Sequence, residues 1–202
     1  MTRYAKLMLG LVLFGTGLWL GLQAELGVGP WDVLHGGLAE RLGTPFGRTS
    51  IAVGLVVFAI ALASGVRAGP GTLLNVLVIG AVIDLLLATG LLAGLGDASP
   101  VLRTAVVLVG IALVAAGSAL YLGAHLGPGP RDGLMVAISR RTGWSVGRSR
   151  GTLEVAVLVV GAALGGPVGP GTVAFALLIG PAVQVAFGLL RQTPQPRERE
   201  AA

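Results

Sequence analysis

Long apolar runs restrict the fold of this 202-residue chain more than any other feature of its sequence. A helix needs about 20 predominantly apolar residues to cross the hydrocarbon core of a bilayer. Runs near that length cover residues 7–26, 51–66, 72–92, 101–122, 153–166 and 172–190. Only 11% of the residues are charged, whereas soluble domains average about a quarter. The sequence therefore predicts an all-α polytopic membrane protein with six transmembrane helices.

The two halves of the chain repeat each other at an offset of 100 positions. Shared composition explains matches among Ala, Leu, Val and Gly, but it does not align Pro, Asp and Arg at a single offset. A match at a fixed period indicates a repeated structural unit. We therefore expect three-helix repeats over residues 1–100 and 101–190, followed by a disordered cytoplasmic tail over 191–202. The first run has an internal copy, so we interpret it as a retained helix and not as a signal peptide. The matched residues include Gly29, Pro30, Asp32, Arg41, Gly47, Arg48 and Thr72, which recur as Gly129, Pro130, Asp132, Arg141, Gly147, Arg148 and Thr172.

The distribution of basic residues predicts that the two repeats have opposite orientations. Three spans per repeat make the second repeat enter the membrane from the other side. With both termini in the cytoplasm, most Lys and Arg residues lie on the cytoplasmic side, as in membrane proteins generally. Only Arg41, Arg48 and Arg103 then lie on or near the outer side. This is the pattern of an inverted-topology repeat, which many secondary transporters contain.

A short helix is predicted between the first two spans of each repeat, over residues 30–42 and 130–142. Pro30 suits the first helical position, and Asp32 in the first turn complements the helix dipole. Gly43 can end the helix in the left-handed conformation. A helix of this length is roughly 20 Å long, which is too short to cross the bilayer core. It is either an interfacial helix that covers the bundle or a re-entrant half-helix that lines a pathway.

Polar residues inside the predicted spans are the first candidates for a substrate or ion pathway. Asp84 lies in the middle of the third span, where a carboxylate is costly and usually faces the bundle interior or water. It is either a contact for an ion or substrate, or a packing residue that meets Gln184 at the equivalent position of the second repeat. Asn75 suits an interhelical hydrogen bond. Glu154 lies one helical turn from Arg150, and the two can pair.

The repeated charges Asp32, Asp132, Arg48 and Arg148 are further pathway candidates. Symmetric Asp and Arg residues can bind a zwitterionic or amphiphilic solute. They can equally cap helices and fix the loops. Both interpretations stay open from the sequence.

Several classes of function are disfavoured. The chain has no Cys, and its two His residues form no cluster of metal ligands, so we expect no metal site and no cofactor. No nucleophile and base are paired, and the Gly-Pro-Gly-Thr turns lack the Lys of a phosphate-binding loop. We therefore expect no enzyme activity. The basic residues follow membrane topology, so nucleic-acid binding is not expected.

The chain resembles the bacterial YczE/YyaS/YitT family of integral membrane proteins, and most closely the YczE type. The resemblance rests on the segment from Gly27 to Leu34, on Phe46-Gly47-Arg48 and on Gly69-Pro70-Gly71-Thr72. It implies a location in the bacterial cytoplasmic membrane. The association of some members with secondary-metabolite production fits a role in export or in membrane assembly.

Two hypotheses of function follow. The first is a secondary transporter or permease for a small solute, with its site between the repeats near Asp84 and the two short helices. The second is a non-transporting membrane scaffold or assembly factor for a partner complex. A transporter requires a polar cavity that reaches mid-membrane, whereas a scaffold requires a tightly packed bundle in which Asp84 is sealed. Glycine-rich faces such as 17–21 favour either a homodimer or packing inside the bundle.

Overall fold

The computed structural model describes residues 2–66 and 69–192, a part of the chain that contains helices and no strands. The all-α prediction is confirmed. The predicted tail lies outside the described residues from position 193 onward. The helices are α1 (Arg3–Gln23), α2 (Pro30–Leu42), α3 (Phe46–Ala63), α4 (Pro70–Ala88), the short 3-10 helix η1 (Leu95–Asp97), α5 (Pro100–Leu122), α6 (Pro130–Thr142), α7 (Val146–Ala163) and α8 (Pro170–Leu189).

Five of the described helices, α1, α3, α4, α5 and α8, are long and apolar enough to cross a membrane. The sixth predicted span corresponds to α7, which has the same length as α3, 18 residues. However, α7 contains Arg148, Arg150 and Glu154, and these charges lower its hydropathy. The structure thus supports five spans by length and composition, and the count of six is not confirmed.

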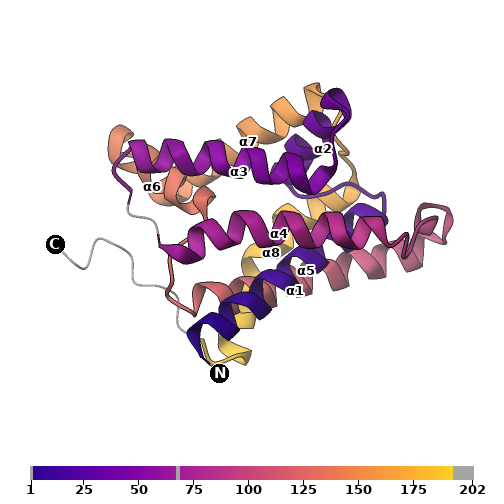
Figure 1. The fold of residues 1–202 in the computed structure, drawn as a ribbon. Helices are drawn as coiled ribbons and strands as arrows, with labels where there is room; N and C mark the ends of the chain where they lie inside the picture. The colour runs from indigo at the N-terminus through magenta and orange to yellow at the C-terminus, as the bar shows by residue number, and fades with distance from the viewer. Residues whose placement is uncertain (1, 67–68, 193–202) are drawn as a thin grey trace.

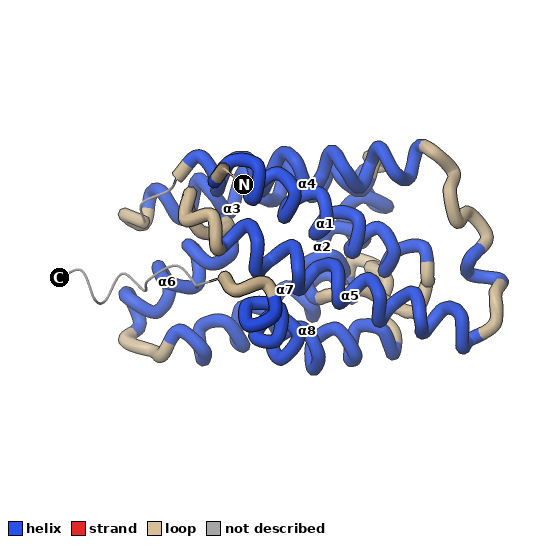
Figure 2. Tube along the Cα trace, turned by 90° about the horizontal axis from the view of Figure 1, so that it is seen from below, coloured by secondary structure: helices blue, strands red, loops and turns tan. Residues whose placement is uncertain are grey.

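The helices form two layers (Figure 1). In one layer α4, α1, α5 and α8 lie side by side in that order, as the view from below also shows (Figure 2). The other layer holds α2, α3, α6 and α7. Within it, the short helix of each half packs against the long helix of the other half, α2 on α7 and α6 on α3. The two halves therefore interlock.

Four glycines allow α1 and α5 to cross in close contact at the centre of the first layer. A Cβ atom on Gly17 would lie 2.5 Å from the carbonyl oxygen of Gly110, and one on Gly10 would lie 2.8 Å from that of Gly117. The pairing runs antiparallel, because the lower-numbered residue of α1 meets the higher-numbered residue of α5. Backbones approach this closely only where side chains are absent.

Backbone hydrogen bonds between loops and helix starts also join the two halves. The backbone N–H of Gly171 donates to the carbonyl of Leu26 at 2.6 Å, and that of Gly71 donates to the carbonyl of Leu126 at 2.8 Å. Thr72 lies in the first turn of α4, and its hydroxyl accepts the N–H of Gly69. The Gly-Pro-Gly-Thr turns therefore start helices and join the two halves.

The residues predicted to begin and end the short helices do so in the structure. Pro30 opens α2 and Pro130 opens α6. Gly43 and Gly143 end these helices in the left-handed conformation, with φ of 61° and 71°. Arg41 donates through Nε to the carbonyl of Leu164 at 3.1 Å, at the carboxyl end of α7. The residues of one repeat thus complete helix ends in the other.

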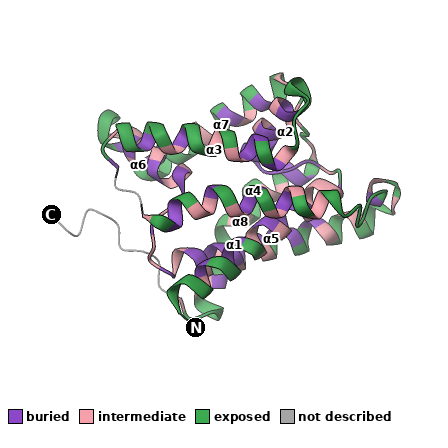
Figure 3. Ribbon diagram, viewed as in Figure 1, coloured by how far each residue is buried: buried purple, intermediate pink, exposed green. Residues whose placement is uncertain are grey.

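The outer surface of the described chain is largely apolar. Buried residues lie where neighbouring helices pack together, and exposed residues lie on the outer faces (Figure 3). Large apolar side chains are exposed along the long helices, among them Leu85, Leu177 and Leu189. Apolar outer faces of this extent suit contact with lipid.

Replacing Gly17 by Ala is expected to destabilise the fold. The added Cβ would clash with the backbone of α5, and overpacking of this kind costs about 1–3 kcal/mol. The measurement is thermal unfolding of the purified protein in detergent. Gly21→Ala in the same helix is the matched control, because its Cβ would meet only Val28, at 4.0 Å. Equal melting temperatures for the two variants would refute the close crossing.

Candidate functional site

A cavity of about 350 Å³ lies between the two layers, and each of the helices α1 to α8 contributes to its lining. Its volume is in the range of pockets that bind small molecules. The lining includes Phe14 of α1, Ile79 of α4, Val114 of α5 and Ile179 of α8, all from the interior of long helices. The cavity is therefore central in the bundle.

Both short helices point their amino-terminal ends into this cavity. Pro30 to Asp32 and Pro130 to Asp132 line it. Gly29, just before α2, packs against Phe175, and Gly129, just before α6, lies close to Asn75. Phe175 and Asn75 lie about a turn and a half inside α8 and α4. Both short helices thus begin beside the second turn of a long helix, at the cavity.

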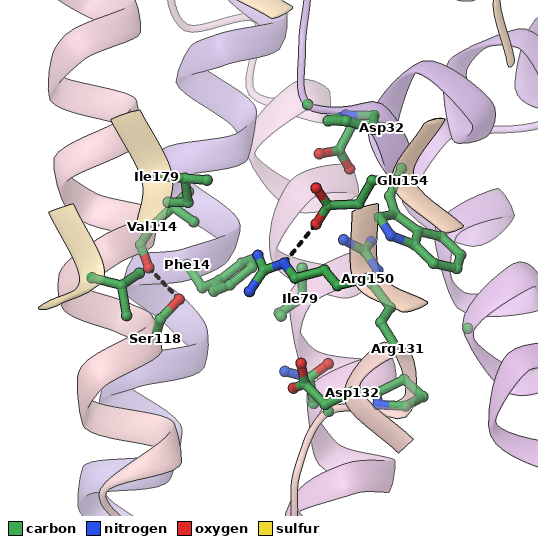
Figure 4. Close-up of a pocket in the computed structure, with 18 of the residues that line it drawn as sticks. Phe14, Asp32, Ile79, Val114, Ser118, Arg131, Asp132, Arg150, Glu154 and Ile179 are labelled. Carbon is green, nitrogen blue, oxygen red and sulfur yellow. Dashed lines mark hydrogen bonds and ion pairs between the residues drawn. The ribbon is translucent and has the colours of Figure 1, made fainter. Parts of the chain in front are cut away.

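One wall of the cavity carries the charges (Figure 4). Arg150 donates through Nε to Oε1 of Glu154 at 2.9 Å, as the sequence spacing predicted. The guanidinium of Arg131 lies 4.8 Å from the centre of the Trp31 ring, in a cation–π contact. Tyr121 donates its hydroxyl to Oδ2 of Asp132 at 3.4 Å. The side chains that carry these contacts come from α2, α5, α6 and α7.

Asp32 and His35 form the most deeply buried polar pair of this wall. They are 3% and 1% exposed, and His35 Nδ1 lies 3.3 Å from Asp32 Oδ1. Neither atom makes a hydrogen bond of acceptable geometry within the described chain. A buried carboxylate oxygen without a donor is costly, so this pair is a candidate for a ligand or proton contact.

The opposite wall is apolar. Phe14, Val114 and Ile179 face the charged wall across the cavity (Figure 4). Ser118 also lies there, but its hydroxyl donates to the carbonyl of Val114 at 2.7 Å. The cavity is therefore amphipathic, with charges on one side and hydrocarbon on the other.

The structure brings five of the eight predicted pathway residues to the cavity. These are Asp32, Asp132, Asn75, Glu154 and Gln184. The sequence did not single out Arg131, His35 or Tyr121 as site residues, although Arg131 directly precedes Asp132 in the repeated element. Arg150 was expected only as the partner of Glu154.

Asp84, Arg48 and Arg148 are not among the lining residues. Asp84 instead accepts the backbone N–H groups of Gly47 at 2.6 Å and Arg48 at 2.9 Å, at the amino-terminal end of α3. This position satisfies two of the free N–H groups of the helix and complements its dipole. The carboxylate therefore joins α4 to α3, while Gln184 lies elsewhere.

In the second half, α7 does not pack against α8 in the way that α3 packs against α4. A Cβ atom on Gly47 would collide with the backbone of Gly80, because α3 packs tightly along α4. The equivalent glycines, Gly147 and Gly180, have nothing within 4 Å of a Cβ atom. α7 makes no contact with α8 comparable to that of α3 with α4. The halves thus differ at this one interface.

Comparisons with known proteins agree with this architecture. Residues 1–187 match the model of a family described as a family of unknown function, DUF6198. An uncharacterized protein of Haemophilus influenzae is 38% identical over 188 residues, which cover 93% of this chain and 84% of the relative. The uncharacterized membrane protein YczE of Bacillus subtilis is 34% identical over 186 residues, covering 88% and 82%. This similarity confirms the resemblance to the YczE type. No solved structure matches the chain.

Replacing Asp84 by Asn is expected to lower stability by about 1–3 kcal/mol, the range for hydrogen bonds to a charged group. The cause is the loss of a charged acceptor for the N–H groups of Gly47 and Arg48. Thermal unfolding in detergent measures the effect. Asp97→Asn, at an exposed carboxylate, is the control. A wild-type melting temperature for Asp84→Asn would show that this contact contributes nothing.

Proposed function

Because this chain belongs to DUF6198, a family of unknown function whose relatives include a membrane protein, we propose its function from its own geometry. We propose that it is a permease that carries a small solute through the central cavity between its two halves. The observation that carries this proposal is a cavity of about 350 Å³ in which charged side chains face an apolar wall.

Charged groups inside a membrane bundle support a pathway more than a structural role. Such groups are expensive to bury, and they commonly mark routes for substrates, ions or protons. Five ionisable acidic and basic side chains line this cavity, and the amino-terminal ends of two short helices meet there. Interrupted helices whose ends face a central site are a recurring feature of secondary transporters.

The relation between the halves also supports a transporter. Equivalent helices α1 and α5 cross antiparallel through equivalent glycines, and each half contributes a short helix to the other. These contacts are those expected of two repeats with inverted topology. We propose that α7 is the sixth span, equivalent to α3, with its charges facing the cavity. Both termini would then lie on the cytoplasmic side of a bacterial membrane.

The difference between the halves suggests how the solute enters and leaves. The side bounded by α3 and α4 is closed by Gly47, Gly80 and Asp84. The side bounded by α7 and α8 lacks that contact, and α8 contains Pro181, which weakens the helix at this point. A second state would close Gly147 onto Gly180 and open the side at Asp84. Solute binding would shift the population between these states.

The competing scaffold hypothesis has less support. Asp84 is held by hydrogen bonds, as a scaffold requires, but the bundle around it contains a charged cavity that a scaffold does not need. Gly17 contacts α5 within the chain, so this glycine serves internal packing and not a homodimer. Our proposal includes no enzyme activity, cofactor, metal or nucleic acid.

Access to the cavity from water tests this proposal. Since the chain has no Cys, Ser118→Cys introduces a single thiol on the cavity wall. In membrane vesicles, 2-aminoethyl methanethiosulfonate is expected to label this thiol through the aqueous pathway. Val109→Cys on the same helix is the control, because its exposed side chain faces away from the cavity and is covered by lipid. Absence of labelling at both positions would favour a sealed scaffold.

A further inference from the structure

The charges that line the cavity do not balance. Three carboxylates, Asp32, Asp132 and Glu154, face two guanidinium groups, Arg131 and Arg150, and this leaves one negative charge. His35 and Tyr121 are the other titratable groups of the lining. His35 is 1% exposed, and burial disfavours a charged imidazole. The unoccupied cavity therefore lacks one positive charge.

The pairing of the charges places this deficit at Asp32. Glu154 is held by Arg150 at 2.9 Å, and Asp132 receives the hydroxyl of Tyr121. Arg131 lies over the ring of Trp31. Asp32 is also attracted by the Arg131 guanidinium, but its Oδ1 atom is buried without a hydrogen bond in the described chain. The His35 imidazole lies 3.3 Å from this atom.

A buried negative charge must be neutralised by a proton or by a bound cation. A ligand that carries a positive charge supplies what the lining lacks. Its ammonium hydrogens would also donate to Oδ1 of Asp32, which has no hydrogen bond in the described chain.

We propose, on the basis of the permease function above, that the solute is a monovalent organic cation with an apolar body. Its ammonium group would bind at Asp32. Its apolar body would lie against Phe14, Val114 and Ile179 on the opposite wall, which offers no charged group.

An anionic solute fits the cavity less well. Amino-terminal helix ends attract anions, but α2 and α6 already carry Asp32 and Asp132 in their first turns. Both arginines are also engaged, Arg150 with Glu154 and Arg131 with Trp31. An added carboxylate would increase the negative charge that is already in excess.

Three probes of similar shape and different charge test the inference on the full chain in detergent: 2-phenylethylammonium, 2-phenylethanol and 3-phenylpropanoate. A ligand of the folded state raises the melting temperature by mass action. We expect the ammonium to stabilise the protein most and the carboxylate least.

The variant Asp32→Asn separates the two proposals. It is expected to lose stabilisation by the ammonium and to keep that by 2-phenylethanol, because the cavity remains. Glu40→Gln, an equal change of charge at the exposed end of the same helix, should behave as wild type. The order of stabilisation by the three probes is measured on wild-type protein, so it tests the inference even where Asp32→Asn fails to fold.

Other orders of stabilisation by the three probes would contradict the inference. Equal stabilisation by ammonium and alcohol, or a preference for the carboxylate, would overturn the cation inference and leave the permease intact. Absence of stabilisation by all three probes would overturn the inference and also weaken the proposed permease.

Discussion

The antiparallel crossing of α1 and α5 is the contact on which the rest of the structure depends. Gly10 and Gly17 of α1 lie against Gly117 and Gly110 of α5, so the two backbones touch. Lipid supplies no hydrophobic force to associate apolar helices, and close backbone packing takes its place. With this pair at the centre, α4 and α8 lie on its two flanks and form the layer that supports the cavity.

The second layer explains how an apolar chain accommodates charges. A helix that its neighbours pack against along its whole length would leave no space for charged side chains. α2 and α6 instead begin beside the second turn of α8 and α4, and their first turns bring Asp32, Arg131 and Asp132 into the cavity. Arg150 and Glu154 of α7 face the same space and pair with each other. Asp132 likewise receives the hydroxyl of Tyr121, so these three charged groups have partners within the protein.

Much of this arrangement could be predicted from the sequence. The punctuation by Pro30, Asp32 and Gly43 predicted α2 to its ends, because capping is a local property. Repetition of Asp32 at Asp132 predicted two related residues, and both line the cavity. The pairing of Arg150 with Glu154 followed from their spacing on one helix.

Contacts between distant segments could not be predicted in the same way. Asp84 was interpreted either as an ion or substrate contact or as a packing residue that meets Gln184. It instead binds N–H groups of α3, a partner that no spacing in the sequence indicates. The repeat predicted a sixth span in α7, whereas five of the described helices, without α7, are apolar enough to cross a membrane. Arg131 was not predicted as a site residue because the prediction relied on residues that are identical in the two repeats, and the equivalent residue in the first repeat is Trp31.

The central claim is that the interface between α7 and α8 closes when the one between α3 and α4 opens. Distances between spin labels in lipid nanodiscs test it most directly, with one pair at Val155→Cys and Leu177→Cys and the equivalent pair at Leu55→Cys and Leu77→Cys, all exposed positions. The α7–α8 pair should show a second, shorter distance that approaches the α3–α4 distance, with populations that shift when 2-phenylethylammonium is added. A single distance in each pair, unchanged by this ligand, would contradict the alternation.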